Sequence, residues 1–182
     1  SRRRPLSQSE INALLRATQS KDVTKPWTYW LPRVALLNGM RLSEIAGLAT
    51  GDVEEIDGVW TFRVRPNAHR DLKTHTSTRD IPIHPRLVAL GLPELAKGRH
   101  SDALLFADAP STNGTSNAAQ KRMGRVVRSV ISDERATFHS LRHNFRDATR
   151  NAGIPSDVVA KLGGWAGNGN QSMDGYGRGH RL

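Results

Sequence analysis

The segment 137–147 (TFHSLRHNFRD) constrains the fold most, because it predicts an amphipathic helix with one cationic face. His139, Arg142 and His143 stand at positions i, i+3 and i+4, so a helix projects all three from one side. Imidazole and guanidinium groups on one face suit a negatively charged, tetrahedral group such as phosphate. The apolar residues that would anchor this helix in a core lie on a neighbouring side and are Leu141 and Phe145.

The charge balance indicates the kind of partner. The chain has 182 residues, enough for one well-buried domain or two small ones, and its 27 Lys and Arg outnumber 17 Asp and Glu. The formal charge of +10 is typical of a nucleic-acid binder, and a merely soluble basic protein is the alternative. The absence of cysteine excludes disulfides and thiolate zinc sites. Without a membrane-length apolar run or a signal-peptide core, we expect a cytoplasmic domain that binds DNA or RNA.

Helical patterns occupy both ends of the chain. Ser7 and Glu10 form a capping box that opens the first helix. A second apolar pattern follows, in which Pro32 predicts a start or a kink and Gly39 a C-cap. Further helices are expected over 85–90, over 116–130 with a Ser116 cap, and over 155–162, closed by Gly163 and Gly164.

Strand patterns are confined to the middle of the chain. Segment 58–64 alternates apolar and polar residues, and segment 79–83 predicts another strand, with Pro82 at its edge or end. The polar stretch 71–78 between them is typical of a hairpin and offers Lys73 at the rim of a small antiparallel sheet. The sequence therefore predicts an α+β fold, mostly helical, with a small antiparallel sheet.

Arg41 precedes a short apolar stretch in which Ser43 would cap a helix. In a turn between two apolar helices, the guanidinium would emerge into a cleft with Glu44 orienting it. The alternative is an ordinary surface ion pair between Arg41 and Glu44.

The predicted helix over 116–130 carries a row of basic side chains. In a chain of this charge they would contact a phosphate backbone, and the alternative is a solvated helix face. These residues are Lys121, Arg122, Arg125 and Arg128.

The last residues are rich in Gly and Asn and too polar for a core, so we expect 166–182 to be a mobile tail. This tail presents one tyrosine, Tyr176, between two glycines.

The order of these motifs resembles the catalytic domain of the tyrosine recombinases, the phage-integrase family. Gly-x-Arg-x-x-Glu at 39–44, a hairpin lysine before Arg-x-Ile-Pro at 79–82, and His-x-Leu-Arg-His at 139–143 follow one another as in that family. Leu-Gly-Gly-Trp at 162–165 and then Tyr176 complete the pattern. A lone Gly-x-Arg or Tyr is weak, but five elements in order over most of the chain are specific.

The resemblance implies a role for each matching residue of the phosphate site. Arg41 and Arg142 would bind the non-bridging oxygens of the scissile DNA phosphate. Lys73 would protonate the 5′-oxygen leaving group, and His139 would assist proton transfer to or from the nucleophile.

The same resemblance assigns the remaining positions. Tyr176 would be the nucleophile that forms a 3′-phosphotyrosyl link, and Trp165 would pack and hydrogen-bond near the phosphate. Glu44 takes the family's acidic position behind the arginines, and His143 that of a structural histidine.

The resemblance also implies extent and partners. We expect a single catalytic domain over 1–182, without the N-terminal core-binding domain, and ending six residues (182 − 176) after Tyr176, where relatives continue onto a neighbouring protomer. The interval from Trp165 to Tyr176 is slightly longer than expected. Full-length relatives act as homo-tetramers on specific double-stranded DNA sites with accessory DNA-bending or directionality proteins, and this chain alone would be monomeric. A phage, prophage or other mobile element in a bacterial host would encode it.

The implied chemistry requires neither metal nor ATP, so we expect no cofactor. Attack by a phenolate adds charge to the equatorial phosphate oxygens, which Arg41, Arg142, Lys73 and His139 would stabilise. A free tyrosine with a pKa of about 10 is only ~0.1% ionised at neutral pH, so Tyr176 would have to dock in the cationic pocket to react. The phosphotyrosine conserves bond energy, so religation needs no ATP.

Three other interpretations stay open. His139 and His143 have the i, i+4 spacing of a zinc site, but the intervening Glu and any cysteine are missing. In a DNA-binding module without catalysis, Tyr176 would be only a tail residue. A type IB topoisomerase shares the chemistry, although the His-x-Leu-Arg-His and Gly-Gly-Trp patterns favour a recombinase.

Overall fold

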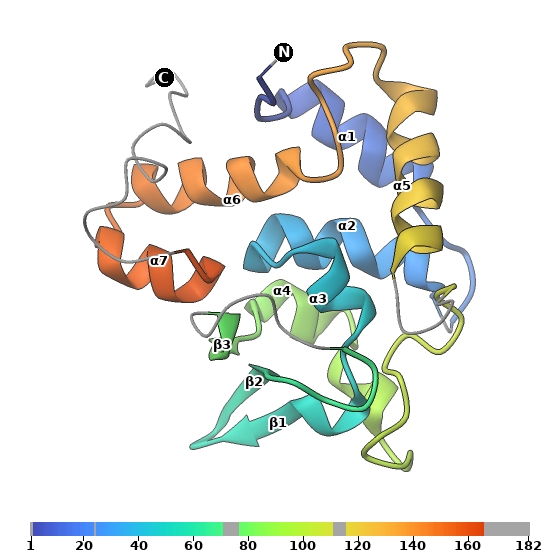
Figure 1. Cartoon of the computed structure of the whole chain (residues 1–182), viewed down its shortest axis with the longest axis vertical. Coiled ribbons are helices and arrows are strands. Elements are labelled where there is room, and N and C mark those ends of the chain that lie inside the picture. Colours follow the sequence, from blue (N-terminus) through green and yellow to red (C-terminus); the bar gives the residue numbers. More distant parts are fainter. Residues whose placement is uncertain (1, 24, 71–76, 111–115, 166–182) are drawn as a thin grey trace.

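The computed structural model describes residues 2–23, 25–70, 77–110 and 116–165 (Figure 1). Its helices form the larger part of the molecule, and a three-stranded antiparallel sheet lies at one end, which confirms the predicted α+β class. The elements are α1 (Gln8–Ala17), α2 (Trp27–Asn38), α3 (Leu42–Ala46), η1 (Thr50–Asp52), β1 (Val53–Ile56), β2 (Val59–Val64), β3 (Arg79–Pro82), α4 (Pro85–Ala89), η3 (Pro93–Ala96), α5 (Asn117–Val130), α6 (Ser140–Asn151) and α7 (Ser156–Gly163).

Helix α2 is the central helix of the core and contacts α1, α3, α4 and α6. It begins at Trp27 and runs through Pro32, so the predicted start at Pro32 is wrong. Burial of Trp30 and its apolar neighbours outweighs the one backbone hydrogen bond that the proline removes. Gly39 ends the helix in the left-handed conformation, with φ of 67°, which confirms the predicted C-cap.

The sheet has the order β1-β2-β3, and its inner face joins the same core. Phe62 of β2 pairs with Ile81 of β3, and both side chains are buried. Strand β3 lies at an edge and ends at Pro82, where the missing N–H is tolerated, as predicted. Strand β1 was not predicted, because its sequence VEEI has two adjacent glutamates and lacks apolar alternation.

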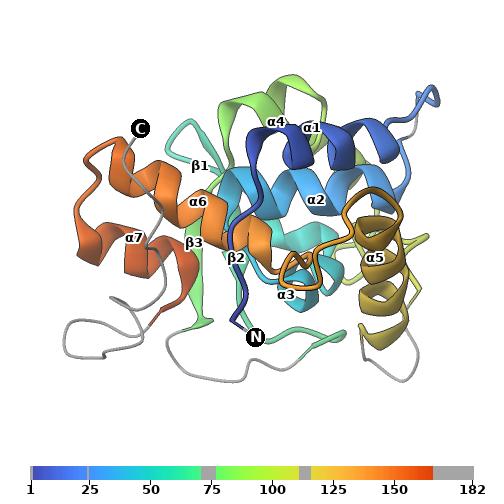
Figure 2. The ribbon, with the colours of Figure 1, turned by 90° about the horizontal axis from the view of Figure 1, so that it is seen from above.

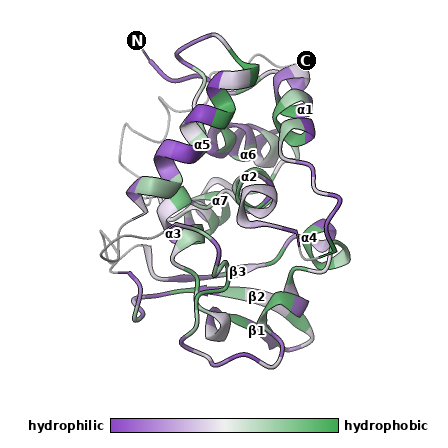
Figure 3. Cartoon of the chain, turned by 90° about the vertical axis from the view of Figure 1, so that its right-hand side faces the viewer, coloured by the Kyte–Doolittle hydropathy of each residue, from purple (hydrophilic) through white to green (hydrophobic). Residues whose placement is uncertain are grey.

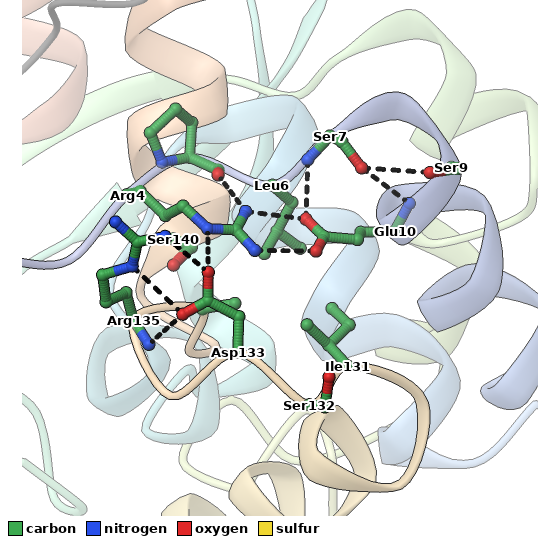
Figure 4. Close-up of polar contacts among 12 residues, drawn as sticks. Arg4, Leu6, Ser7, Ser9, Glu10, Ile131, Ser132, Asp133, Arg135 and Ser140 are labelled. Carbon is green, nitrogen blue, oxygen red and sulfur yellow. Dashed lines mark hydrogen bonds and ion pairs between the residues drawn. The ribbon is translucent and has the colours of Figure 1, made fainter.

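The N-terminal arm, residues 2–6, is attached to the helical part by polar contacts (Figure 4). Arg4 forms two hydrogen bonds with Glu10, at 2.7 and 2.8 Å, and one with Asp133 at 2.8 Å. The Asn144 side chain on α6 accepts from the backbone N–H of Leu6 at 2.9 Å and donates to its carbonyl at 2.8 Å. The arm therefore lies against α6 and crosses it (Figure 2).

Helix α5 lies at the rim of the molecule with one apolar and one hydrophilic face (Figure 3). Met123 and Val127 are buried, and this face packs against α1. The predicted Ser116 cap is wrong in detail: Ser116 occupies the cap position, but its hydroxyl makes no capping hydrogen bond. Among the described residues, no helix is long and apolar enough to cross a membrane.

Candidate active site

Helix α6 gathers the predicted cationic residues. The helix begins at Ser140, slightly later than predicted, because the Ser140 hydroxyl accepts the Thr137 N–H at 2.9 Å and His139 takes the N-cap position. The rings of His139 and His143 lie edge to face, with centroids 5.5 Å apart. The hollow at this face is lined by His139, Arg142, His143, Arg146 and Trp165.

Arg142 is buried beneath this hollow and joins the ends of two helices. Its guanidinium donates to the carbonyl of Gly39 at the end of α2, and to that of Gly163 at the end of α7 at 3.0 Å. The guanidinium carbon lies 4.5 Å from the centroid of the Trp165 ring, a cation–π arrangement. Trp165 thus packs against Arg142.

Arg41 approaches the same place from α3. The helix starts at Leu42 with Arg41 at its N-cap, so the prediction that Ser43 caps it is wrong. The Glu44 carboxylate takes over the capping, accepting the Arg41 backbone N–H at 3.0 Å and its Nη1 at 2.9 Å. The Glu44 side chain is only 4% exposed and that of Arg41 is 32% exposed, so this ion pair is half-buried.

The turn at Gly163 and Gly164 brings the two arginines together. Arg142 donates to the Gly163 carbonyl, and Arg41 donates to the next carbonyl, Gly164, at 3.4 Å. Gly164 has φ of 67°, and a Cβ on Gly163 would lie 1.8 Å from the Trp165 ring. Two successive glycines are therefore required for the close approach of both guanidiniums and the indole.

Arg79 of β3 is a member of this cluster that the sequence did not single out. Its Nη1 and Nη2 each donate to a Glu44 carboxylate oxygen at 3.0 Å. Burial raises the pKa of Glu44, but the hydrogen bonds from Arg79 and then Arg41 outweigh it and lower the pKa to about 2. Glu44 is therefore ionised and is shared by two guanidiniums.

The two histidines are neutral at physiological pH. Burial, followed by the positive charge of Arg142, lowers the pKa of His139 to about 3 and that of His143 to about 4. A neutral imidazole at His139 has a nitrogen lone pair with which to accept a proton. Within the described ranges no group of three or more His, Cys, Asp or Glu is arranged to hold a metal ion.

The remaining predicted residues divide into two groups. Lys73 and Tyr176 lie outside the described residues, as does the tail 166–182. On α5, Lys121, Arg122 and Arg125 are exposed. The fourth, Arg128, donates to three carbonyls, those of Ile131, Ser132 and Ala136, at 2.7–3.1 Å.

Arg146 was missed, although a signal was present. It follows Arg142 by four residues and therefore shares its face of α6. The structure places its guanidinium carbon 5.1 Å from the Trp165 centroid, with the residue 1% exposed. It adds a further positive charge behind the hollow.

The comparisons with known proteins agree with this geometry. The sequence profile described as Phage integrase family matches residues 4–171. A comparison with curated protein sequences found no match. The fold is similar to that of the Tn1549 transposon integrase in complex with circular intermediate DNA, at 20% identity and a TM-score of 0.67, covering 98% of this chain and 63% of that one.

Two further recombinase structures share the fold. XerH bound to palindromic difH is 18% identical with a TM-score of 0.63, over 92% of this chain and 48% of that one. A lambda integrase dimer bound to a COC′ core site is 19% identical with a TM-score of 0.63, over 100% and 62%. The chain thus spans less than two thirds of the length of these proteins. From its match over residues 4–171, the chain belongs to the phage integrase family.

Proposed function

We propose that the chain is the catalytic domain of a site-specific DNA recombinase of the tyrosine type. The observation that carries this proposal is that Arg41 and Arg142 meet at successive carbonyls of one turn, beside a neutral His139. Two fixed guanidiniums side by side suit the two non-bridging oxygens of a phosphodiester. The DNA-bound states of the Tn1549 integrase and XerH support duplex DNA as the substrate.

In the proposed reaction, the Tyr176 hydroxyl gives its proton to His139 and its oxygen attacks the phosphorus. The bond from phosphorus to the 5′-oxygen breaks, and Lys73 supplies a proton to that oxygen. Arg41 and Arg142 stabilise the added negative charge on the equatorial oxygens. The same steps in reverse religate the DNA, so neither metal nor ATP takes part.

Contacts outside the cleavage site are assigned to α5. Lys121, Arg122 and Arg125 project from its exposed face and would bind backbone phosphates. Assembly into a tetramer on two DNA sites, and any accessory proteins, belong to the same proposal.

Trapping of a covalent intermediate tests the function. A library of nicked duplexes of varied sequence is incubated with the protein in EDTA, and adducts that survive denaturant are sequenced. We expect an adduct with wild type and none with Tyr176→Phe. No adduct on any duplex, or an equal yield from the Phe variant, would refute catalysis by Tyr176.

The same assay separates the alternatives. Loss of the adduct in EDTA would favour a metal site at His139 and His143. Relaxation of supercoiled plasmids that lack the selected sequence would favour a topoisomerase. DNA binding without any adduct would leave a non-catalytic DNA-binding module.

A further inference from the structure

We propose that Arg79 is a positioning residue that balances the charge of Glu44 and thereby leaves Arg41 available to the substrate phosphate. The inference rests on the proposed function of the Arg41–Arg142 pair. No role followed for Arg79 from the sequence motif in which it lies.

The geometry divides Glu44 unequally between the two arginines. Arg79 uses both terminal nitrogens, one on each carboxylate oxygen, each at 3.0 Å. Arg41 uses only Nη1 on this carboxylate, at 2.9 Å. The side chains of Arg79 and Glu44 are 6% and 4% exposed, whereas that of Arg41 is 32% exposed. Arg79 is thus the buried, two-point partner, and Arg41 is the one that faces outward.

The charges explain why a second arginine is needed. A buried carboxylate with one guanidinium makes a neutral pair, and a neutral pair attracts a phosphate weakly. With Arg79 present, Glu44 and its two arginines carry a net charge of +1, which Arg41 presents at the site. Without Arg79, the nearest cation to Glu44 would be Arg41. The carboxylate would then draw the Arg41 guanidinium into a bidentate ion pair.

Arg79 also holds the turn on which both phosphate-binding arginines converge. Its Nε donates to the Leu162 carbonyl at 2.9 Å, and its Nη1 to the Ser77 carbonyl at 2.7 Å. A Cβ on Gly164 would lie 2.8 Å from Arg79 Nη1, so the turn rests on this side chain. The carbonyl that follows Leu162 is the acceptor of Arg142.

A further charged residue that contacts Glu44 in the described part of the chain, Arg70, does not replace Arg79. Arg70 donates to the backbone carbonyl of Glu44 at 2.9 Å, and its own charge is met by Asp52 at 3.6 Å. The carboxylate oxygens of Glu44 are thus left to Arg79 and Arg41.

The test compares Arg79→Met with the double variant Arg79→Met/Glu44→Gln. Single-turnover cleavage is measured on a duplex selected by wild type, and thermal unfolding is recorded for each protein. We expect Arg79→Met to slow cleavage by about 10- to 100-fold, by analogy with residues that orient metal ligands through a hydrogen bond. The double variant should recover most of this loss, because no carboxylate remains to neutralise Arg41. A matched control is Arg63→Met on β2, which breaks surface ion pairs with Glu54 and Asp80 and should leave cleavage unchanged.

The pH profile distinguishes charge balance from support of the fold. Loss of Arg79 raises the pKa of Glu44, so the deficit of Arg79→Met relative to wild type should shrink as the pH falls toward that pKa. The double variant should show no such trend. Should Arg79→Met fail to fold, Arg79→Lys, which keeps one charge but cannot reach both Glu44 and Leu162, is compared with Arg79→Lys/Glu44→Gln instead.

Two results would overturn the inference. One is a folded Arg79→Met that cleaves within about twofold of wild type; the other is a double variant no faster than the single one. Inorganic phosphate binding, followed by NMR, gives a readout without cleavage, and about tenfold weaker binding to Arg79→Met is expected. If wild type forms no adduct, the proposed function fails while this measurement still decides the role of Arg79.

Discussion

The two arginines that converge on the Gly163–Gly164 turn are held in opposite ways. Arg41 is half exposed and is oriented by a buried carboxylate, which is itself shared with a second arginine. Arg142 is 2% exposed and is oriented by neutral groups, two backbone carbonyls and an indole ring. The α3 side therefore needs a charge balance, whereas the Gly39, Gly163 and Trp165 groups that contact Arg142 on the α6 side are all neutral.

This difference shows that a guanidinium can be oriented in two separate ways, by buried neutral acceptors or by an ion pair. Carbonyl acceptors orient a guanidinium without cancelling its charge, but they require helix ends that meet closely. A carboxylate orients the guanidinium more strongly, but its negative charge reduces the electrostatic attraction between that guanidinium and a phosphate. In this site a carboxylate orients Arg41 and backbone carbonyls orient Arg142.

The largest expected effect concerns the arginines themselves. Arg41→Ala and Arg142→Ala should each slow single-turnover cleavage by about 10²- to 10³-fold, the usual loss for one preorganised donor. Their stabilities should differ. Arg142→Ala leaves buried carbonyls without donors at about 1–3 kcal/mol each, whereas Glu44 keeps Arg79 in Arg41→Ala.

Denaturant unfolding and adduct formation measure both quantities, with the exposed Arg16→Ala on α1 as a control. Equal losses of unfolding free energy in the two variants would break the comparison.

The next largest expected effect is on stability and concerns Gly39, whose carbonyl accepts from Arg142. A Cβ at Gly39 would lie 2.2 Å from the Phe145 ring, and its φ of 67° disfavours any other residue. Gly39→Ala should lower the free energy of unfolding by about 3 kcal/mol, combining backbone strain and displacement of the ring. Gly58 has φ of 78°, and a Cβ added there would have no other atom within 4 Å. The loss of unfolding free energy in Gly58→Ala therefore measures the backbone strain alone. Equal losses of unfolding free energy in Gly39→Ala and Gly58→Ala would show that the Phe145 ring moves aside without an energetic cost.

The pH dependence of stability isolates the α6 side. Because folding lowers the pKa of His139 and His143 from 6.5 to about 3 and about 4, the unfolded chain binds more protons below pH 6.5. Their contribution is fully present above pH 6.5 and is lost as the pH falls toward the folded values. We expect a loss of about 1 kcal/mol between pH 7 and pH 5, allowing for solvent screening.

Urea unfolding at several pH values measures this slope, and the His139→Gln/His143→Gln variant should flatten it. Glu10 and Glu44, whose pKa values are lowered from 4.5 to about 2, lose their stabilising contribution only as the pH falls below about 4.5. A slope unchanged in the double variant would contradict the neutral histidines.

The smallest effect lies on α5, where charge is exposed and not held by the site. Arg125→Ala should reduce the slope of log K against log salt for DNA binding by about 1. Arg128→Ala should change it less, because that guanidinium is engaged with three carbonyls. Equal changes would show that Arg128 leaves those carbonyls to bind phosphate.

How far the site could be predicted depended on what local sequence can encode. Spacing predicted the common face of His139 and Arg142, and the Gly39 cap followed from its place after an apolar helix. The Arg79–Glu44 pair joins residues 35 positions apart, so no local periodicity could reveal it. The cap of α3 was predicted at Ser43 because serine is a common capping residue. In the structure the Glu44 side chain accepts the Arg41 N–H instead.

The Glu44 carboxylate has a consequence for when the protein can act. Its contacts draw together the start of α3, the start of β3 and, through Arg79, the end of α7. These segments are distant in the chain, so they meet only after the sheet and the last helix have docked. In a partly folded chain Arg41 and Arg142 therefore do not converge. Local opening of α7 alone would withdraw Trp165 and the Gly163 and Gly164 carbonyls together, and so would release both guanidiniums from the turn on which they converge.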